Sequence, residues 1–195
     1  MKTINKIIAT CVGLFLFFTF SNFNSLDDIF QSFSSSEIEI AANSKEENIR
    51  EKAIVKAVID GDTFKAEFSN GEVETIRLLL IDTPETVSPN VPEQPYGKEA
   101  SDFLKRHLIR HSVVEIEKGI EERDKYNRLL AYVWRDGKNI NKALLEEGLA
   151  RVAYIYEPNT KYLNEFKRAE RKAKEERKGI WSIDGYVTEK GFNYP

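Results

Sequence analysis

Three β-branched runs joined by tight turns constrain the fold of this chain more than any other feature of its sequence. The first run, 53–59, ends at the acidic turn Asp-Gly-Asp of 60–62, and the second, 63–68, alternates apolar and polar residues as a half-buried strand does. Asn70-Gly71 then gives a strong hairpin signal, because both residues tolerate the positive φ angles of a type I′ turn. A third run from 73 to 81 completes a predicted three-stranded meander.

The pattern that follows the meander predicts a closed barrel rather than an open sheet. The remaining elements are, in order, a proline-rich loop over 82–95, a helix that begins after Tyr96-Gly97, strands over 113–117 and 128–135, and helices over 140–147 and 160–178. Five strands with a helix between the third and the fourth is the order of an OB-fold. We therefore expect an α+β fold, a five-stranded OB-fold β-barrel with three α-helices, whose closure removes the exposed sheet edges.

Residues 1–25 have the pattern of a signal peptide or membrane anchor. Lys2 and Lys6 precede an uncharged run over 7–20, which is shorter than the roughly 20 residues of a membrane-spanning helix and matches a signal-peptide core. No clear small-residue cleavage site follows this run. Two locations are therefore expected, secretion or a tether through 7–20 to the outer face of the cell membrane.

The rest of the chain divides by composition into three parts. Residues 26–51 are polar and Ser-rich and are expected to form a linker or pro-region. Residues 52–183 hold the predicted barrel and helices, and 184–195 are expected as a C-terminal extension.

The scarcity of Cys and His narrows the chemistry that is available. The chain has one Cys, Cys11, and two His, whereas a disulfide needs two Cys and structural zinc needs about four Cys or His ligands. The net charge is −3, which excludes a polycation that binds nucleic acid by bulk charge. If the chain is an enzyme, its chemistry is expected from carboxylates, Arg, Lys or Tyr.

Arg77 lies inside an otherwise apolar strand, where a guanidinium is costly unless an anion pairs with it. At strand spacing, Arg77, Leu79 and Ile81 share one face, and Asp82 and Glu85 follow just past the strand end. One interpretation is a structural ion pair between Arg77 and one of these acids.

The other interpretation is a hard-cation site beside a phosphate site. Asp62 and Asp82 would supply carboxylate oxygens and Thr83 a backbone carbonyl, which are ligands that calcium prefers. Glu85 would then be close enough to activate a water molecule.

Two aromatic clusters also have two interpretations each. Lys125, Tyr126 and Arg128 stand within one short segment that is either a charged turn or a second phosphate clamp with a stacking ring. Tyr154 and Tyr156, at i and i+2, are either packing residues or a wall for a nucleic-acid base.

Taken together, several ordered segments resemble the staphylococcal nuclease (thermonuclease) family. The segments are I-D-G-D-T, R-L-L-L-I-D-T-P-E-T, Y-G-K-E-A-S, D-K-Y-N-R, L-A-Y-V, G-L-A-R-V-A-Y-I-Y and K-G-I-W-S, and they span about residues 53–182. The resemblance implies an OB-fold and a calcium-dependent endonuclease. Such an enzyme hydrolyses DNA and RNA, single-stranded or frayed, to products with 3′-phosphate ends.

The resemblance also implies a role for each matching residue. The implied calcium ligands are Asp62, Asp82 and Thr83; the catalytic residues are Glu85 as general base with Arg77 and Arg128 stabilising the phosphate; and the substrate-binding residues are Lys125, Tyr126, Tyr154 and Tyr156. The family often has Gly where Asn127 stands, and Asn tolerates left-handed geometry. The chain is expected to act as a monomer without an obligate protein partner. The alternative is a catalytically silent OB-fold module that binds nucleic acid or protein.

Overall fold

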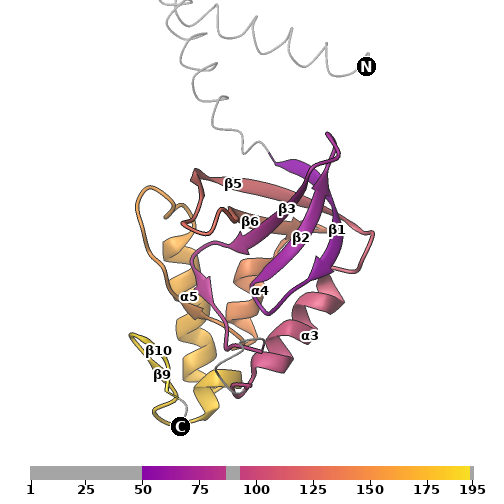
Figure 1. Cartoon of the computed structure of the whole chain (residues 1–195). Coiled ribbons are helices and arrows are strands. Elements are labelled where there is room, and N and C mark those ends of the chain that lie inside the picture. The colour runs from indigo at the N-terminus through magenta and orange to yellow at the C-terminus, as the bar shows by residue number, and fades with distance from the viewer. Residues whose placement is uncertain (1–49, 87–92, 194–195) are drawn as a thin grey trace, which may run out of the picture. The chain divides into compact units, whose positions relative to one another are not determined.

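The computed structural model describes residues 50–86 and 93–193, which are coloured in Figure 1. The expected signal or anchor segment, 1–25, and nearly all of the expected linker, 26–51, lie outside the described residues. Within the described part of the chain, no helix is both long and apolar enough to cross a membrane.

The strands form a closed barrel, as predicted. One sheet has the order β3-β2-β1-β5-β6-β7, and an additional parallel pairing of β3 with β6 joins its two sides. All other neighbours in this sheet are antiparallel. The strands are β1 (Glu51–Val58), β2 (Thr63–Phe68), β3 (Val73–Leu78), β5 (Val113–Arg123), β6 (Leu129–Arg135) and the short β7 (Lys138–Asn139).

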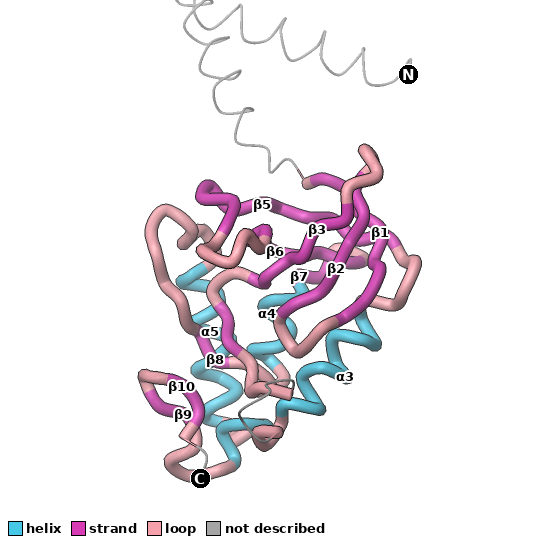
Figure 2. Tube along the Cα trace, in the orientation of Figure 1, coloured by secondary structure: helices cyan, strands magenta, loops and turns pink. Residues whose placement is uncertain are grey.

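Three α-helices pack against the barrel in the described residues, and Figure 2 shows them gathered below the strands. They are α3 (Gly97–His107), α4 (Ile140–Glu146) and α5 (Leu163–Glu175), followed by the 3₁₀ turn η2 (Gly179–Ser182). Asn139 caps α4 by accepting a hydrogen bond from the amide of Lys142 at 2.9 Å. Fully buried side chains of both layers, such as Phe64, Leu104 and Phe166, fill the core between barrel and helices.

The third strand ends earlier than the sequence pattern predicts. β3 stops at Leu78, and Leu80 has a φ of 62°, which turns the chain before β4 (Ile81–Asp82) pairs with β8 (Arg151–Val152). The expected alternation from Arg77 to Asp82 is therefore wrong beyond Leu78. Leucine rarely adopts this conformation, at a cost of about 1–2 kcal/mol, but the buried Leu80 side chain offsets that strain by packing in the core.

The described part of the expected C-terminal extension forms a small hairpin. It consists of β9 (Val187–Thr188) and β10 (Gly191–Phe192), and it follows Tyr186, whose side chain is buried. Figure 1 shows this hairpin, in yellow, beside the lower half of α5.

Candidate active site

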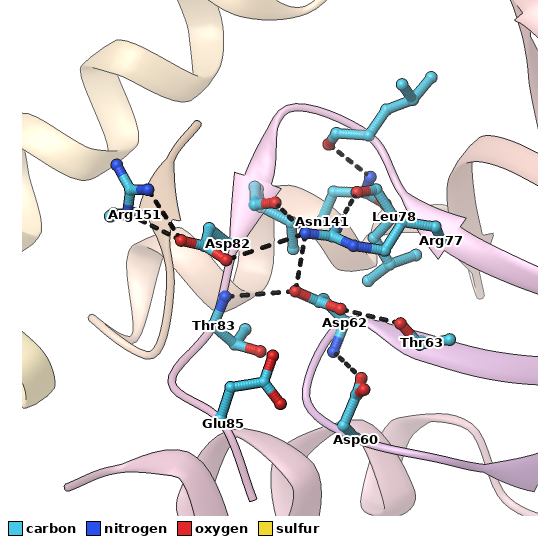
Figure 3. Close-up of polar contacts among 12 residues, drawn as sticks. Asp60, Asp62, Thr63, Arg77, Leu78, Asp82, Thr83, Glu85, Asn141 and Arg151 are labelled. Atoms are coloured by element: carbon cyan, nitrogen blue, oxygen red, sulfur yellow. Dashed lines mark hydrogen bonds and ion pairs between the residues drawn. The ribbon is translucent and has the colours of Figure 1, made fainter. Parts of the chain in front are cut away.

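Arg77 is buried at one end of the barrel and pairs with Asp62. Its Nη2 lies 2.9 Å from Asp62 Oδ2 and donates to the carbonyl of Ile81 at 3.0 Å, while Nη1 donates to the carbonyl of Leu78 at 2.6 Å (Figure 3). Each of the paired side chains is at most 9% exposed. An ion pair with a neighbouring acid is confirmed, but the close partner is Asp62 of the β1–β2 turn rather than Asp82 or Glu85.

Asp82 has a second arginine as its partner. Its Oδ2 lies 2.9 Å from both Nε and Nη2 of Arg151, and its Oδ1 lies 3.9 Å from Arg77 Nη2. We did not predict Arg151. It also stands in an apolar run, so the reasoning that singled out Arg77 would have found it.

Asp62 is fixed on both oxygens. Thr63 Oγ1 donates to Oδ1 at 2.9 Å, and the backbone amide of Thr83 donates to Oδ2 at 3.3 Å. The close approach of the two loops requires glycine at position 61, because a Cβ there would lie 2.6 Å from Thr83 Oγ1 and 2.7 Å from the Cβ of Ala100. Gly61 thus allows the Asp62 turn to meet Thr83.

Hydrogen bonds hold the backbone of Glu85, and its carboxylate points toward the acidic turn that contains Asp60 and Asp62 (Figure 3). Its amide donates to Gln94 Oε1 at 2.9 Å, and its carbonyl accepts from the Gln94 amide at 3.0 Å. Gly97 keeps this loop close to α3, since a Cβ there would lie 2.7 Å from the Glu85 carbonyl oxygen. Gln94 is thus a positioning residue that sequence reasoning missed.

The carboxylates perturb one another's titration. Partial burial, followed by the charges of Asp62 and Asp82, raises the pKa of Glu85, and the charges of Arg77 and Arg128 act in the opposite direction. Burial is the largest influence on Asp82 and raises its pKa, as does the charge of Asp62. The charges of Arg151 and Arg77 lower it but do not cancel the rise. Crowded acids with raised pKa values favour a cation among them.

Asp60, the first residue of the acidic turn, also belongs to this cluster. Burial and the charge of Asp62 raise its pKa from 3.8 to about 6, although Asp60 Oδ1 also accepts a hydrogen bond from the Asp62 amide at 3.1 Å. The predicted site did not include Asp60, although it stands in the same turn.

Arg128 is aimed by a loop that Asp124 organises. Asp124 Oδ1 accepts from the amides of Tyr126 and Arg128, each at 2.9 Å, and Oδ2 accepts from Arg128 Nε at 2.7 Å. Asn127 has a φ of 61°, so the expected left-handed geometry is confirmed. Asn127 thus makes the left-handed turn that places Arg128 directly before β6.

The predicted tyrosines lie at the surface, and two of them, Tyr126 and Tyr154, lie beside Arg128 and Arg77. The ring centre of Tyr126 is 4.9 Å from Lys125 Nζ and 5.5 Å from the Arg128 guanidinium, and the ring centre of Tyr154 is 5.3 Å from the Arg77 guanidinium. Tyr154 and Tyr156 are 54% and 68% exposed, so they do not pack in the core. Both tyrosines follow the end of β8 at Val152, and Tyr154 has a φ of 52°, so their i, i+2 spacing is not that of a β-strand.

The donor atoms fit a hydrated hard cation. Among the described residues, no group of three or more carboxylate, imidazole or thiol side chains is placed to hold a metal ion. The ligand set that the resemblance implies, Asp62, Asp82 and the Thr83 carbonyl, would therefore need water to complete the shell of a cation. Calcium accepts such sets, because it takes six to eight oxygen ligands that often include water.

Comparison with known proteins identifies the family. The family model described as "Staphylococcal nuclease homologue" matches residues 75–183. The chain belongs to the staphylococcal nuclease family. This match contains Arg77, Asp82 and Glu85 of the cluster and also Arg128, whose charge acts on Glu85.

Named relatives of this nuclease family include two Bacillus subtilis proteins. The chain is 56% identical over 137 residues to the SPbeta prophage-derived endonuclease YokF, a match that covers 69% of this chain and 45% of YokF. It is 54% identical over 137 residues to endonuclease YncB, covering 69% of this chain and 64% of YncB. The chain thus spans about half to two thirds of the length of these two relatives.

A third relative is matched over most of its length. The chain is 49% identical over 125 residues to the thermonuclease of Staphylococcus hyicus, covering 64% of this chain and 72% of that enzyme.

Proposed function

We propose that this protein is a calcium-dependent endonuclease that hydrolyses phosphodiester bonds of DNA and RNA and leaves 3′-phosphate ends. Single-stranded or frayed nucleic acid is the expected substrate. Membership of the staphylococcal nuclease family and similarity to an endonuclease and a thermonuclease support the reaction class. The side chains of the site support the roles of calcium and of the catalytic residues, and the 3′-phosphate product ends are what the resemblance to the family implies.

The observation that carries the proposal is the electrostatic position of Glu85. The charges of Asp62 and Asp82 raise the pKa of its carboxyl, and the charges of Arg77 and Arg128 lower it. A carboxylate near a proposed cation-binding pair and near two guanidinium groups has the setting that a general base needs beside a bound phosphodiester.

The side chains divide the reaction between them. Arg77 and Arg128 would each present a planar guanidinium to phosphate oxygens and stabilise the charge that develops there. Glu85 would take a proton from the water that attacks phosphorus, while the bond to the 5′-oxygen breaks and that oxygen takes up a proton from solvent water. Asp62, Asp82 and the Thr83 carbonyl would hold calcium, which when bound supplies positive charge that weakens the repulsion between phosphate and nucleophile.

The substrate surface is expected around the two arginines. Lys125 and Tyr126 beside Arg128, and Tyr154 beside Arg77, offer a cation and exposed rings to a terminal phosphate and to bases. Tyr156 is proposed to extend this surface, and its exposure supports that role.

The cellular setting is part of the proposal. Lys2, Lys6 and the apolar run 7–20 support export, after which the protein is either secreted or tethered through 7–20 to the outer face of the cell membrane. A monomer without an obligate protein partner is the expected form. N-terminal sequencing of the mature protein tests the choice between secretion and tether.

A nuclease assay tests the proposal directly. Hydrolysis of heat-denatured DNA and of RNA is expected with calcium and should stop with a chelator, and end-group analysis should find 3′-phosphates. Glu85→Gln is expected to lower kcat by about 10²–10⁴-fold, whereas Glu99→Gln, an exposed residue of α3, should not change kcat. Binding of DNA without hydrolysis would instead favour the silent OB-fold module.

A further inference from the structure

The C-terminal hairpin, which we define as Tyr186–Asn193, is fixed to the domain by its first residue. Tyr186 is 2% exposed, and its ring centre lies 5.4 Å from that of Phe192 across the hairpin. The amide of Asn193 donates to the Tyr186 carbonyl at 2.7 Å, which closes the hairpin at its base. These contacts make the segment an ordered element rather than a loose tail.

One side of the hairpin contacts the arginine that holds Asp82. Arg151 Nη1 donates to the carbonyl of Glu189 at 3.3 Å, and the Arg151 guanidinium lies 5.8 Å from the ring centre of Phe192. The same guanidinium uses Nε and Nη2 to bind Asp82 Oδ2, each at 2.9 Å. The hairpin and Asp82 therefore accept from different nitrogen atoms of the same buried side chain, Arg151.

The base of the hairpin contacts the loop that holds Glu85. The hydroxyl of Tyr186 donates to the carbonyl of Pro95 at 2.7 Å. The adjacent residue, Gln94, makes both hydrogen bonds that hold the backbone of Glu85. Just before the hairpin, Ser182 Oγ lies 2.9 Å from the hydroxyl of Tyr96, a second contact with the same loop.

We propose that the C-terminal hairpin is a positioning element of the active site, which orients Asp82 through Arg151 and Glu85 through the Gln94–Tyr96 loop. This inference rests on the proposed function, because it assigns the hairpin a role toward the calcium ligand and the general base. Groups that orient a metal ligand from outside the first shell commonly change metal affinity by about 10–100-fold when they are removed.

The two routes can be separated by substitution. Phe192→Ala removes the ring beside Arg151 and should act on Asp82, whereas Tyr186→Phe removes only the hydroxyl that binds Pro95 and should act on Glu85. A chain that ends at Ile183 removes both contacts. Lys190→Ala, at the exposed tip between β9 and β10, is the matched control.

The experiment measures calcium binding by titration calorimetry, which does not depend on activity, together with kcat, KM and thermal unfolding of each protein. The chain that ends at Ile183 is expected to bind calcium about 10-fold more weakly and to lose kcat. Phe192→Ala should mainly weaken calcium binding, and Tyr186→Phe should mainly lower kcat while calcium affinity stays within about twofold of the unmodified chain. Lys190→Ala should match the unmodified chain in every measurement.

The outcomes distinguish this inference from the proposed function. An unmodified chain without calcium-dependent hydrolysis would overturn both. An active unmodified chain whose shortened form keeps its calcium affinity and kcat would overturn the positioning role alone. If the shortened chain does not fold, Phe192→Ala and Tyr186→Phe decide the question. If both variants lose calcium affinity and kcat equally, and only in proportion to a lower melting temperature, the positioning role is overturned.

Discussion

Arg77 and Asp62 form a buried ion pair between β3 and the turn that precedes β2, with Nη2 2.9 Å from Oδ2. The antiparallel register places Thr63 opposite Arg77, so the residue next to Thr63 along the chain meets the guanidinium at the end of the barrel. The pair is thus both a part of the fold and a part of the proposed catalytic centre. Arg77 and Arg128 share one proposed chemical role, but we expect only Arg77 to contribute strongly to the stability of the fold.

Arg77→Ala is expected to lower the free energy of unfolding by about 3–5 kcal/mol in chelator, because it leaves a buried Asp62 carboxylate unpaired. Arg128→Ala should cost about 1 kcal/mol or less, since its partner Asp124 lies in a partly exposed loop. Both variants should lose hydrolysis. Urea unfolding of the two proteins makes the comparison, and equal losses of stability would contradict the buried role of Arg77.

The titration of Glu85 should respond to its neighbours in the metal-free protein. Its pKa is expected above the ordinary value of 4.5, so the base becomes protonated and inactive at a higher pH than an isolated Glu. Asp82→Asn should lower the pKa of Glu85, because it removes a repelling charge, and Arg128→Gln should raise it. NMR titration of the Glu85 carboxyl carbon in chelator measures each shift, and shifts of the opposite sign would refute this account of the site.

Asp60→Asn should stabilise the metal-free protein at neutral pH. The pKa of Asp60 is raised to about 6, so the folded state binds its proton more tightly than the unfolded state does. The contribution of Asp60 to the free energy of unfolding is therefore fully present below the ordinary pKa of 3.8, and it is lost as pH rises through 6. The asparagine retains the acceptor for the Asp62 amide and should gain about 2–3 kcal/mol at pH 7.

Unfolding of wild type and Asp60→Asn at pH 7 and near pH 3.5, both in chelator, tests this difference. The gain should nearly vanish at the lower pH, where Asp60 is largely protonated in both states. An equal gain at both values would show that the effect has no link to ionisation.

Gly61→Ala is expected to weaken calcium binding and to destabilise the fold by about 1–3 kcal/mol. The added methyl would meet Thr83 Oγ1 and the Cβ of Ala100, so the Asp62 turn must move away from Thr83. Gly71→Asn is the matched control, because a Cβ at that hairpin turn meets nothing within 4 Å and asparagine tolerates its positive φ. Calorimetric calcium titration should separate the two variants.

Local chemistry in the sequence predicted much of this site. A guanidinium in an apolar strand required an anion, and Arg77 has one; asparagine tolerates left-handed geometry, and Asn127 adopts it. The sequence placed Asp82 beside Arg77, and the two side chains do pair at 3.9 Å, but the closer partner, Asp62, was not predicted. Asp62 reaches the guanidinium because the register of β2 against β3 sets Thr63 opposite Arg77.

Other features depend on tertiary contacts that no local pattern reveals. Leu80 adopts a left-handed conformation against its own preference, since burial of its side chain compensates. β5 continues to Arg123, six residues beyond the predicted end, since Lys118 and Arg123 both pair with β6 on either side of an irregularity in the register. The residues of this stretch are mostly charged, so their sequence does not predict a strand. The role of Gln94 depends on a loop closing onto α3, which composition does not indicate.

The parallel pairing of β3 with β6 has a consequence for how activity reports on folding. Arg77 is in register with Leu130, so the arginines at 77 and 128 come together only when the barrel closes over more than fifty residues of chain. A partly folded molecule in which these strands are apart has only half of the phosphate-binding pair. The rate of hydrolysis should therefore be proportional to the concentration of fully folded molecules. Its loss in denaturant should coincide with the global unfolding transition.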